Sequence, residues 1–410
     1  MASLSPAHQQ GTFSALRHHN FKLYFGGQFI SIAGMWMQTV AQGWLVYHLT
    51  KSELMLGVVA CAAGVPSLLL SPFAGVVVDR FRRRDILLLT QVLGMVLALV
   101  LAYLTLSGQV QVWHVVLLAL CDGLVKTLDA PARQAFIKDM VGPEDLSSGI
   151  TLNSMMSNGA RIIGPAFAGV LLATVGAGWC FFFNGVSFLA VVGSLVFMHL
   201  PPIVYTPRHA SPLQQMREGW HYSRQHPVIA PLLLLSAVVS IFAVNMVTVL
   251  PSFAATVLYS PINGYSTLST AQGVGAVVGA LGLVFLTRRL GRGQVVTIIT
   301  LELSVACVLL SRMTFVPLAA LLMALVGMGF VTFFVTINTL LQNAVPDEFR
   351  GRVMSLFTLT FLGLTPFAAL AMGYLAEIVG TPNAMALYGL LNGLFCGLIL
   401  LRWPDVRRAE

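Results

Sequence analysis

The chain is built from long, uninterrupted runs of apolar residues that are separated by short polar stretches. A helix that crosses a bilayer needs about 20 such residues, and residues 54–78 already supply one run of that length. Of the 410 residues 57% are hydrophobic and only 9% are charged, against roughly 25% in soluble domains. The pattern excludes a soluble enzyme, a secreted disulfide scaffold and a disordered protein. Because the runs are continuous rather than alternating, they also argue against a membrane barrel.

The runs predict an all-α polytopic membrane protein with 12 transmembrane helices. One polar stretch, residues 201–227, is longer than the rest and contains LQQMREGWHYSRQH, which reads as an amphipathic helix on the cytoplasmic side. This linker divides the chain into two six-helix bundles, residues 1–200 and residues 228–410. The expected spans are residues 21–49, 54–78, 85–107, 113–135, 149–175, 179–200, 229–258, 266–287, 294–312, 315–342, 352–378 and 383–402.

Basic residues alternate between the loops in a way that sets the topology. The N-terminal stretch, the even-numbered gaps and the C-terminal stretch hold 19 of the 23 Lys and Arg residues, whereas the odd-numbered gaps hold only Lys51 and Arg312. Cytoplasmic loops carry such an excess of positive charge. We therefore expect both termini to be cytoplasmic and the protein to lie in the inner cell membrane. Since the net charge of +8 comes from these clusters, it indicates topology rather than nucleic-acid binding.

Two segment pairs repeat at one spacing. VGPEDL at 141–146 matches VPDEFR at 345–350, and GVLLATVG at 169–176 matches GYLAEIVG at 373–380. Both pairs are about 204 residues apart, so the fifth span of each bundle corresponds to the other. Two bundles related by an axis along the membrane normal are typical of transporters. Chance similarity of two helix starts is the alternative.

The loop after the second span carries a recognisable motif, GVVVDRFRRR at 75–84. It resembles the loop signature of the major facilitator superfamily, with Arg82 where many members have glycine. LDAPARQAF (128–136), ARIIGPAFAG (160–169) and VPDEFRGRVMSL (345–356) are similar to its enterobactin exporter and macrolide efflux branch. The residues that fit the loop signature are Gly75, Asp79, Arg80, Arg83 and Arg84.

The resemblance implies a cytoplasmic latch between the two bundles. Asp79 would lie at the start of the eleventh span, where a helix N-terminus stabilises an acid, with Asp129 and Arg133 of the fourth span beside it. The alternative is a basic cluster that only sets topology. Similarly, GPAFAG resembles a fifth-span exporter motif, while a plain small-residue packing face explains it nearly as well. Its residues are Gly164, Pro165 and Gly169.

The fourth span carries four charges, Asp122, Lys126, Asp129 and Arg133. At 100° per residue they fall within a stripe of roughly 60°. Each charge costs several kcal/mol in lipid, so the stripe faces the protein interior or water. The resemblance places the fourth span beside the central cavity and therefore points the stripe at the substrate path.

Asp122 is the predicted proton-coupling acid, because a carboxylate near the middle of the membrane can exchange a proton with either side. Arg161 and Lys126 would hold its charge or bind an anionic substrate. The alternative is a permanent Asp122–Lys126–Arg161 cluster that only fixes two helices. Glu302, which has no obvious charged partner in sequence, is a rival proton carrier.

Uncharged polar side chains form stripes on two further spans, the first and the tenth. Both spans line the cavity in the resembled fold, so these residues are candidates for contact with an amphipathic organic substrate. Hydrogen bonding between helices is the alternative use for them. The candidates are Gln28, Gln38 and Gln42 on the first span and Thr332, Thr336, Thr339 and Asn343 on the tenth.

These features predict a secondary active transporter that exports a small organic compound, a siderophore or a hydrophobic drug, by proton exchange and alternating access. Uptake or facilitated transport without proton coupling is the alternative, and a membrane-embedded enzyme or lipid-handling protein is the third. We expect no enzyme activity, no cofactor and no metal, because the sequence has no phosphate-binding loop, no catalytic triad and no metal-ligand spacing among its five cysteines. The expected partners are the substrate, protons and the lipid bilayer, with the protein a monomer.

Overall fold

The computed structural model describes residues 13–198 and 212–408, and this part of the chain is made of helices and short turns without a strand. Most helices are long enough to cross a membrane. Their bounds are η1 (Ser14–Arg17), α1 (His19–Thr50), α2 (Glu53–Arg80), α3 (Arg83–Leu106), α4 (Val112–Val141), α5 (Leu146–Thr174), α6 (Ala177–Phe197), α7 (Pro212–Gln225), α8 (Ile229–Phe242), η2 (Val244–Val249), α9 (Leu250–Thr256), α10 (Asn263–Arg289), α11 (Arg292–Leu310), α12 (Val316–Ala344), α13 (Asp347–Thr358), η3 (Leu359–Gly363), α14 (Thr365–Val379), α15 (Thr381–Arg402) and α16 (Asp405–Arg408).

Each expected span coincides with a helix or a series of helices, and the ends differ by a few residues. The seventh and eleventh spans are both present, and each contains a stretch that is not regular α-helix. In the seventh span the short helix η2 separates α8 from α9. The Asn245 amide donates to the Ser240 carbonyl there, and Pro251, which has no backbone N–H, lies in the first turn of α9. The eleventh contains the π-helical turn η3, and Pro366 begins the helix that follows it.

In the described part of the chain, nine helical segments are both long and apolar enough to span a membrane. The other three expected spans, α1, α4 and α5, are 32, 30 and 29 residues long but more polar. These three helices carry the glutamine stripe, the four-charge stripe and Arg161. These three helices therefore bring polar and charged side chains into an otherwise apolar protein interior.

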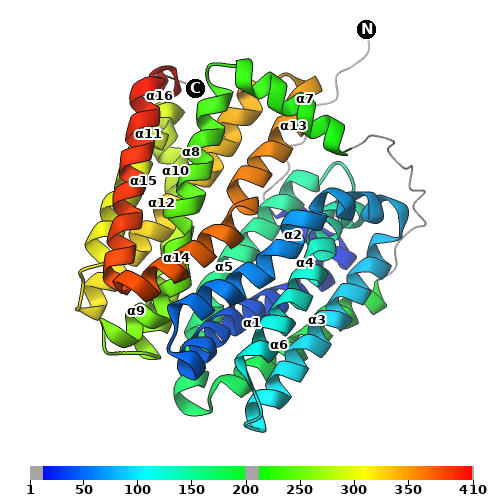
Figure 1. Ribbon diagram of the computed structural model, residues 1–410. Helices are drawn as coiled ribbons and strands as arrows, with labels where there is room; N and C mark the ends of the chain where they lie inside the picture. The colour runs from blue at the N-terminus through cyan, green and yellow to red at the C-terminus, as the bar shows by residue number, and fades with distance from the viewer. Residues whose placement is uncertain (1–12, 199–211, 409–410) are drawn as a thin grey trace.

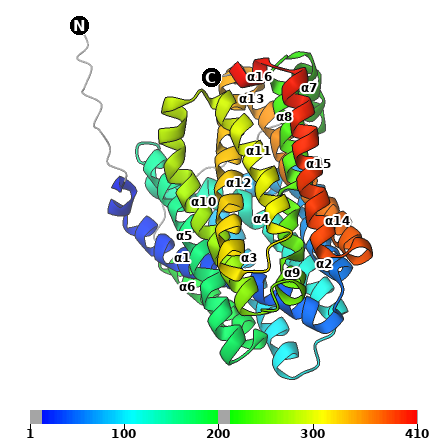
Figure 2. The same cartoon turned by 90° about the vertical axis from the view of Figure 1, so that its left-hand side faces the viewer.

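Helices α1–α6, called here the N-terminal half, pack mainly on one another, as do α8–α16, the C-terminal half. The halves lie side by side in Figure 1, with α7, α13 and α16 at the upper end and α9 at the lower end. They meet where α2 packs on α14 and α5 packs on α10, as the turned view in Figure 2 also shows. At the first contact a side chain at Gly57 would meet the Ala369 carbonyl, and one at Gly373 the Glu53 carbonyl. Glycines thus let these backbones approach closely.

The linker helix α7 packs against α13. The rings of Tyr222 and Phe349 stack with centroids 4.4 Å apart, and Arg352 pairs with Glu218 at 3.1 Å. Trp220 lies on the other face and is 58% exposed. The predicted amphipathic helix therefore exists, with one face on the eleventh span. The rest of the linker, residues 199–211, lies outside the described residues.

Candidate transport site

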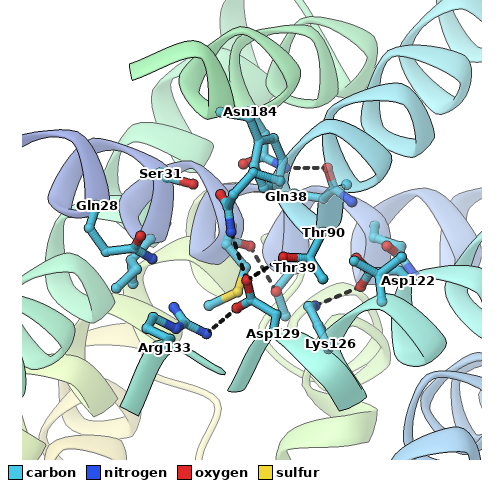
Figure 3. A pocket seen from close by; sticks show the side chains of 17 residues that line it. Gln28, Ser31, Gln38, Thr39, Thr90, Asp122, Lys126, Asp129, Arg133 and Asn184 are labelled. Atoms are coloured by element: carbon cyan, nitrogen blue, oxygen red, sulfur yellow. Dashed lines mark hydrogen bonds and ion pairs between the residues drawn. The ribbon is translucent and has the colours of Figure 1, made fainter. Parts of the chain in front are cut away.

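A pocket opens among α1, α3, α4 and α6 of the N-terminal half (Figure 3). The charged stripe of α4 forms one wall, and the glutamine stripe of α1 faces it. The side chains that line the pocket are Gln28, Ser31, Ile32, Met35, Gln38, Thr39, Gln42, Thr90, Gln91, Gly94, Asp122, Val125, Lys126, Asp129, Arg133, Asn184 and Phe188.

Asp122 and Lys126 form an ion pair on this wall, with 2.6 Å between Oδ2 and Nζ. The predicted i, i+4 pairing of these two residues is confirmed. Their side chains are 24% and 47% exposed, so neither is sealed in the core. The pair is therefore in reach of a molecule that enters the pocket.

Asp129, one turn further along α4, has a full set of partners. Arg133 pairs with it at 2.8 Å, and the Thr90 hydroxyl and the Gln91 amide of α3 donate to it at 3.0 and 2.8 Å. A buried carboxylate that accepts from three donors fixes the helices that carry those donors together. This geometry makes Asp129 a tie between α3 and α4.

The glutamine stripe of α1 faces the pocket as its spacing indicates. The Asn184 amide of α6 donates to Gln38 at 2.7 Å, while Gln28 is buried and Gln42 half-buried. Sequence reasoning missed Asn184 and the α3 pair that binds Asp129. The available signal was their isolation as polar residues within the otherwise apolar runs FFFNGVSF and LLLTQVLGM.

The polar stripe of α12 does not reach this pocket. Thr336 is buried and donates to the Thr332 carbonyl at 2.6 Å, and Thr332 lies against Gly279 of α10. Thr339 donates to its own helix and Asn343 is exposed. The substrate role of these four residues stays a prediction, with Thr332 and Thr336 used in helix packing.

Arg161 of α5 lies apart from the Asp122–Lys126 pair. Its guanidinium carbon stands 4.8 Å from the ring centroid of Trp36 on α1, and its Nε is buried without an acceptor. The three-residue cluster considered from the sequence is therefore reduced to two, because Asp122 pairs with Lys126 alone among the described residues.

The GPAFAG motif brings α5 close to its neighbours. A side chain at Gly164 would meet the Trp36 Cβ at 2.5 Å and the Ala33 carbonyl at 2.6 Å, so only glycine lets α1 cross there. Gly169 faces Ser266 of α10, and Pro165 is buried within α5. The motif thus serves close packing here, and a role in transport direction stays a prediction.

The loop-signature arginines bind within the N-terminal half. Arg83 pairs with Asp139 of α4 at 2.6 Å, and Arg84 donates to the Val196 carbonyl of α6 at 3.0 Å. Arg80 is exposed, and Gly75 has open space beside its Cα. The Asp79 side chain lies outside the described residues, so the predicted latch stays a prediction.

At the opposite end, polar contacts join the two halves. Glu53 at the start of α2 accepts hydrogen bonds from Ser252 of α9 at 2.5 Å and from Thr381 of α15 at 3.1 Å. Glu377 of α14 accepts from the Ser52 hydroxyl at 2.9 Å and from the Leu54 N–H at 3.1 Å. These four hydrogen bonds each join a residue of the N-terminal half to one of the C-terminal half.

Glu302 of α11 is the rival acid. Both of its carboxylate oxygens are buried without a hydrogen-bond partner, and one of them lies against Gly329 of α12. The carboxylate lines no part of the pocket of Figure 3. Within the described residues, no group of three or more His, Cys, Asp or Glu side chains is placed to hold a metal ion.

The sequence pattern of a known family, described as transmembrane secretion effectors, matches residues 10–410. The chain belongs to this family. It is therefore a multi-pass membrane protein of the major facilitator superfamily, in agreement with the resemblance found in its motifs. The family and its characterised relatives are membrane transporters.

Three relatives cover nearly the whole chain. The staphyloferrin A transporter of Staphylococcus aureus is 23% identical over 90% of this chain and 92% of its own length. The enterobactin exporter EntS of Escherichia coli is 25% identical, with 94% and 91% covered. The multidrug efflux pump Tap of Mycolicibacterium fortuitum is 24% identical, with 92% and 94% covered.

Solved structures share the fold at lower identity. A POT family transporter in complex with 5-aminolevulinic acid superposes with a TM-score of 0.79 at 14% identity, covering 97% of this chain and 98% of its own. A D-xylose–proton symporter gives a TM-score of 0.71 at 16% identity, covering 96% and 98%. These similarities establish the major facilitator fold.

Proposed function

We propose that this protein exports a small organic compound, a siderophore or a hydrophobic drug, in exchange for protons. The observation that carries the proposal is the Asp122–Lys126 pair, accessible on the wall of a polar pocket within the membrane-embedded helices. The names of the relatives, which include siderophore and drug exporters, support the substrate class.

The pair supplies a mechanism for exchange. A substrate that donates hydrogen bonds to Asp122 favours the charged carboxylate, whereas a proton on Asp122 removes that acceptor. Proton and substrate therefore compete for one group. Asp129, fixed by Arg133 and by its two α3 donors, holds the pocket wall in place while Asp122 changes charge.

Alternating access would move the two halves against each other about their contacts at α2–α14 and α5–α10. The hydrogen bonds of Glu53 and Glu377 close the end away from the chain termini. With both termini in the cytoplasm, as the basic loops predict, this is the outer side of the inner membrane.

The test measures uptake into inverted membrane vesicles of a panel of dyes, antibiotics and catecholate siderophores, with and without a pH gradient. We expect at least one compound to accumulate only with the gradient, and Asp122→Asn to reduce that accumulation about tenfold or more, since general acid–base groups contribute at least that much.

Asp85→Asn, which changes an exposed carboxylate at the start of α3, serves as the matched control. Gradient-driven accumulation that is unchanged in Asp122→Asn would remove Asp122 from the coupling role. Accumulation that ignores the gradient in the wild-type protein would favour transport without proton coupling.

A further inference from the structure

Positive charges on the helices of the N-terminal half differ in how they are neutralised. Lys126 pairs with Asp122, Arg133 with Asp129 and Arg83 with Asp139, at 2.6 to 2.8 Å. Lys126 and Arg161 both lie well inside the predicted spans. Of these two, Arg161 has no acidic partner among the described residues. In the described part of the chain no acidic side chain neutralises its charge.

Arg161 is held by contacts on two sides. Its guanidinium lies over the Trp36 ring, and Trp36 is brought there by the close crossing at Gly164. On another side, Gly273 of α10 packs against the Arg161 carbonyl, where a Cβ would stand only 2.7 Å from the oxygen. The guanidinium thus contacts α1, while the backbone of the same residue contacts α10 of the other half.

An isolated charge in the membrane interior costs several kcal/mol, and a ring face offsets only about 1–2 kcal/mol of that. The buried Nε also has no acceptor in the described part of the chain. A guanidinium offers donors in a planar fork that matches a carboxylate or a phosphate. The group that satisfies both the charge and the donors is therefore an anion.

We propose that Arg161, held on Trp36, binds an anionic group of the transported organic compound. The inference rests on the proposed function in that the ligand is taken to be the transported compound. It adds the charge class of the substrate and separates two tasks, since Asp122 handles the proton and Arg161 the anion.

The site also lies where the halves must move. Because α10 packs on the Arg161 backbone, a rearrangement of α5 against α10 that buried the guanidinium further without an anion would add to the desolvation cost of an unpaired cation. A bound anion removes that penalty. Binding of an anion to Arg161 therefore makes the conformational change more favourable for the loaded transporter than for the empty one.

The test uses two matched probes, 2-naphthoate and its neutral isostere 2-naphthamide, with the purified full-length protein in lipid nanodiscs. Binding is measured by calorimetry and by the rise in melting temperature that a ligand of the native state produces. We expect the wild-type protein to bind the anion at least tenfold more tightly, Arg161→Gln to lose that preference, and Arg161→Lys to keep part of it.

Controls separate the anion site from structure and from Lys126. Arg289→Gln, which removes an exposed charge at the end of α10, should leave the preference unchanged. Trp36→Phe should keep more of it than Trp36→Leu, because a ring still faces the guanidinium. Loss of the preference in Lys126→Gln but not in Arg161→Gln would overturn the assignment.

Equal binding of the two probes, or binding of neither, by the wild-type protein also overturns it. If Arg161→Gln does not yield folded protein, the comparison of Arg161→Lys with the wild-type protein decides. Gradient-driven export without charge discrimination would refute the anion site and leave the proposed function standing. Charge discrimination in binding without gradient-driven export would refute the proposed function and leave the anion site standing.

Discussion

The two ends of the molecule use polar side chains in opposite ways. At the end near the termini, Arg83, Arg84 and Arg352 bind within their own half or to the linker helix. At the far end, Glu53 and Glu377 accept hydrogen bonds across the boundary between the halves. One end therefore holds each half together internally, and the other end holds the halves to each other.

This difference shows which contacts are free to break. An inter-half contact can open without disturbing either bundle, whereas an ion pair within one half is part of that bundle's stability. The far-end contacts are short charge-assisted hydrogen bonds, worth more than neutral ones but open to competition from water. Such contacts suit a gate that must open repeatedly.

The largest effect is expected from removing the far-end gate. The combined change Glu53→Ala and Glu377→Ala deletes all four of its inter-half hydrogen bonds, each worth about 1 kcal/mol net. Together they amount to about 4 kcal/mol, so the balance between states should shift by a factor of up to about 1000 toward opening at that end. Spin labels at Lys51→Cys and Tyr259→Cys, in a background without native cysteines, should then report a longer distance.

A second label pair, Lys138→Cys and Arg292→Cys, follows the end near the termini and should move closer in the same variant. Glu348→Ala, an exposed carboxylate at that end, is the control and should change neither distance. If both distances in the gate variant match those of the parent, the far-end hydrogen bonds do not hold the halves together.

A smaller effect is expected from the ion pair of Arg83 and Asp139. The Asp139 side chain is only 6% exposed, so Arg83→Gln leaves a nearly buried carboxylate without its partner. Unfolding should become easier by about 3 kcal/mol, within the range for broken buried pairs. The distances between the halves should stay the same, because the pair lies inside one half.

A double-mutant cycle with Asp139→Asn, measured by denaturant unfolding in detergent, tests this expectation. Arg83→Gln and Asp139→Asn together should cost less than the sum of the two single changes. If Arg83→Gln instead alters the label distances at either end, Arg83 acts in a latch between the halves, as the loop signature implies.

Sequence patterns predicted the helices well, because about 20 apolar residues and the alternation of basic loops leave few ways to cross a bilayer. They also placed Asp122 and Lys126 together, since residues four apart on a helix are neighbours. These are local or one-dimensional constraints, and a single sequence carries them in full.

Contacts between helices that are far apart in the sequence could not be predicted from such patterns. The partner of Arg161 is Trp36, 125 positions away in the chain, and nothing in either segment alone specifies the pairing. The gate at Glu53 was missed for the same reason, because its donors come from α9 and α15. The breaks at η2 and η3 depend on a proline combined with side-chain and backbone hydrogen bonds from neighbouring turns.

The smallest effect concerns Asp145, which ties η1 to the start of α5 near the termini. The hydrogen bond from Ser14 and then that from His18 hold the pKa of the Asp145 carboxyl below its usual range. A lowered pKa means that the contribution to stability is complete above the unfolded value of about 3.9 and is lost as the pH falls through the folded value. At neutral pH the contact is therefore fully formed.

Asp145→Asn should speed hydrogen exchange in residues 14–18 and leave the melting temperature unchanged, with Glu144→Gln as the exposed neighbour that alters neither. A fall in melting temperature as large as that of Arg83→Gln would mean that this exposed contact supports the whole N-terminal half, and the distinction between internal ties and peripheral ones at this end would fail.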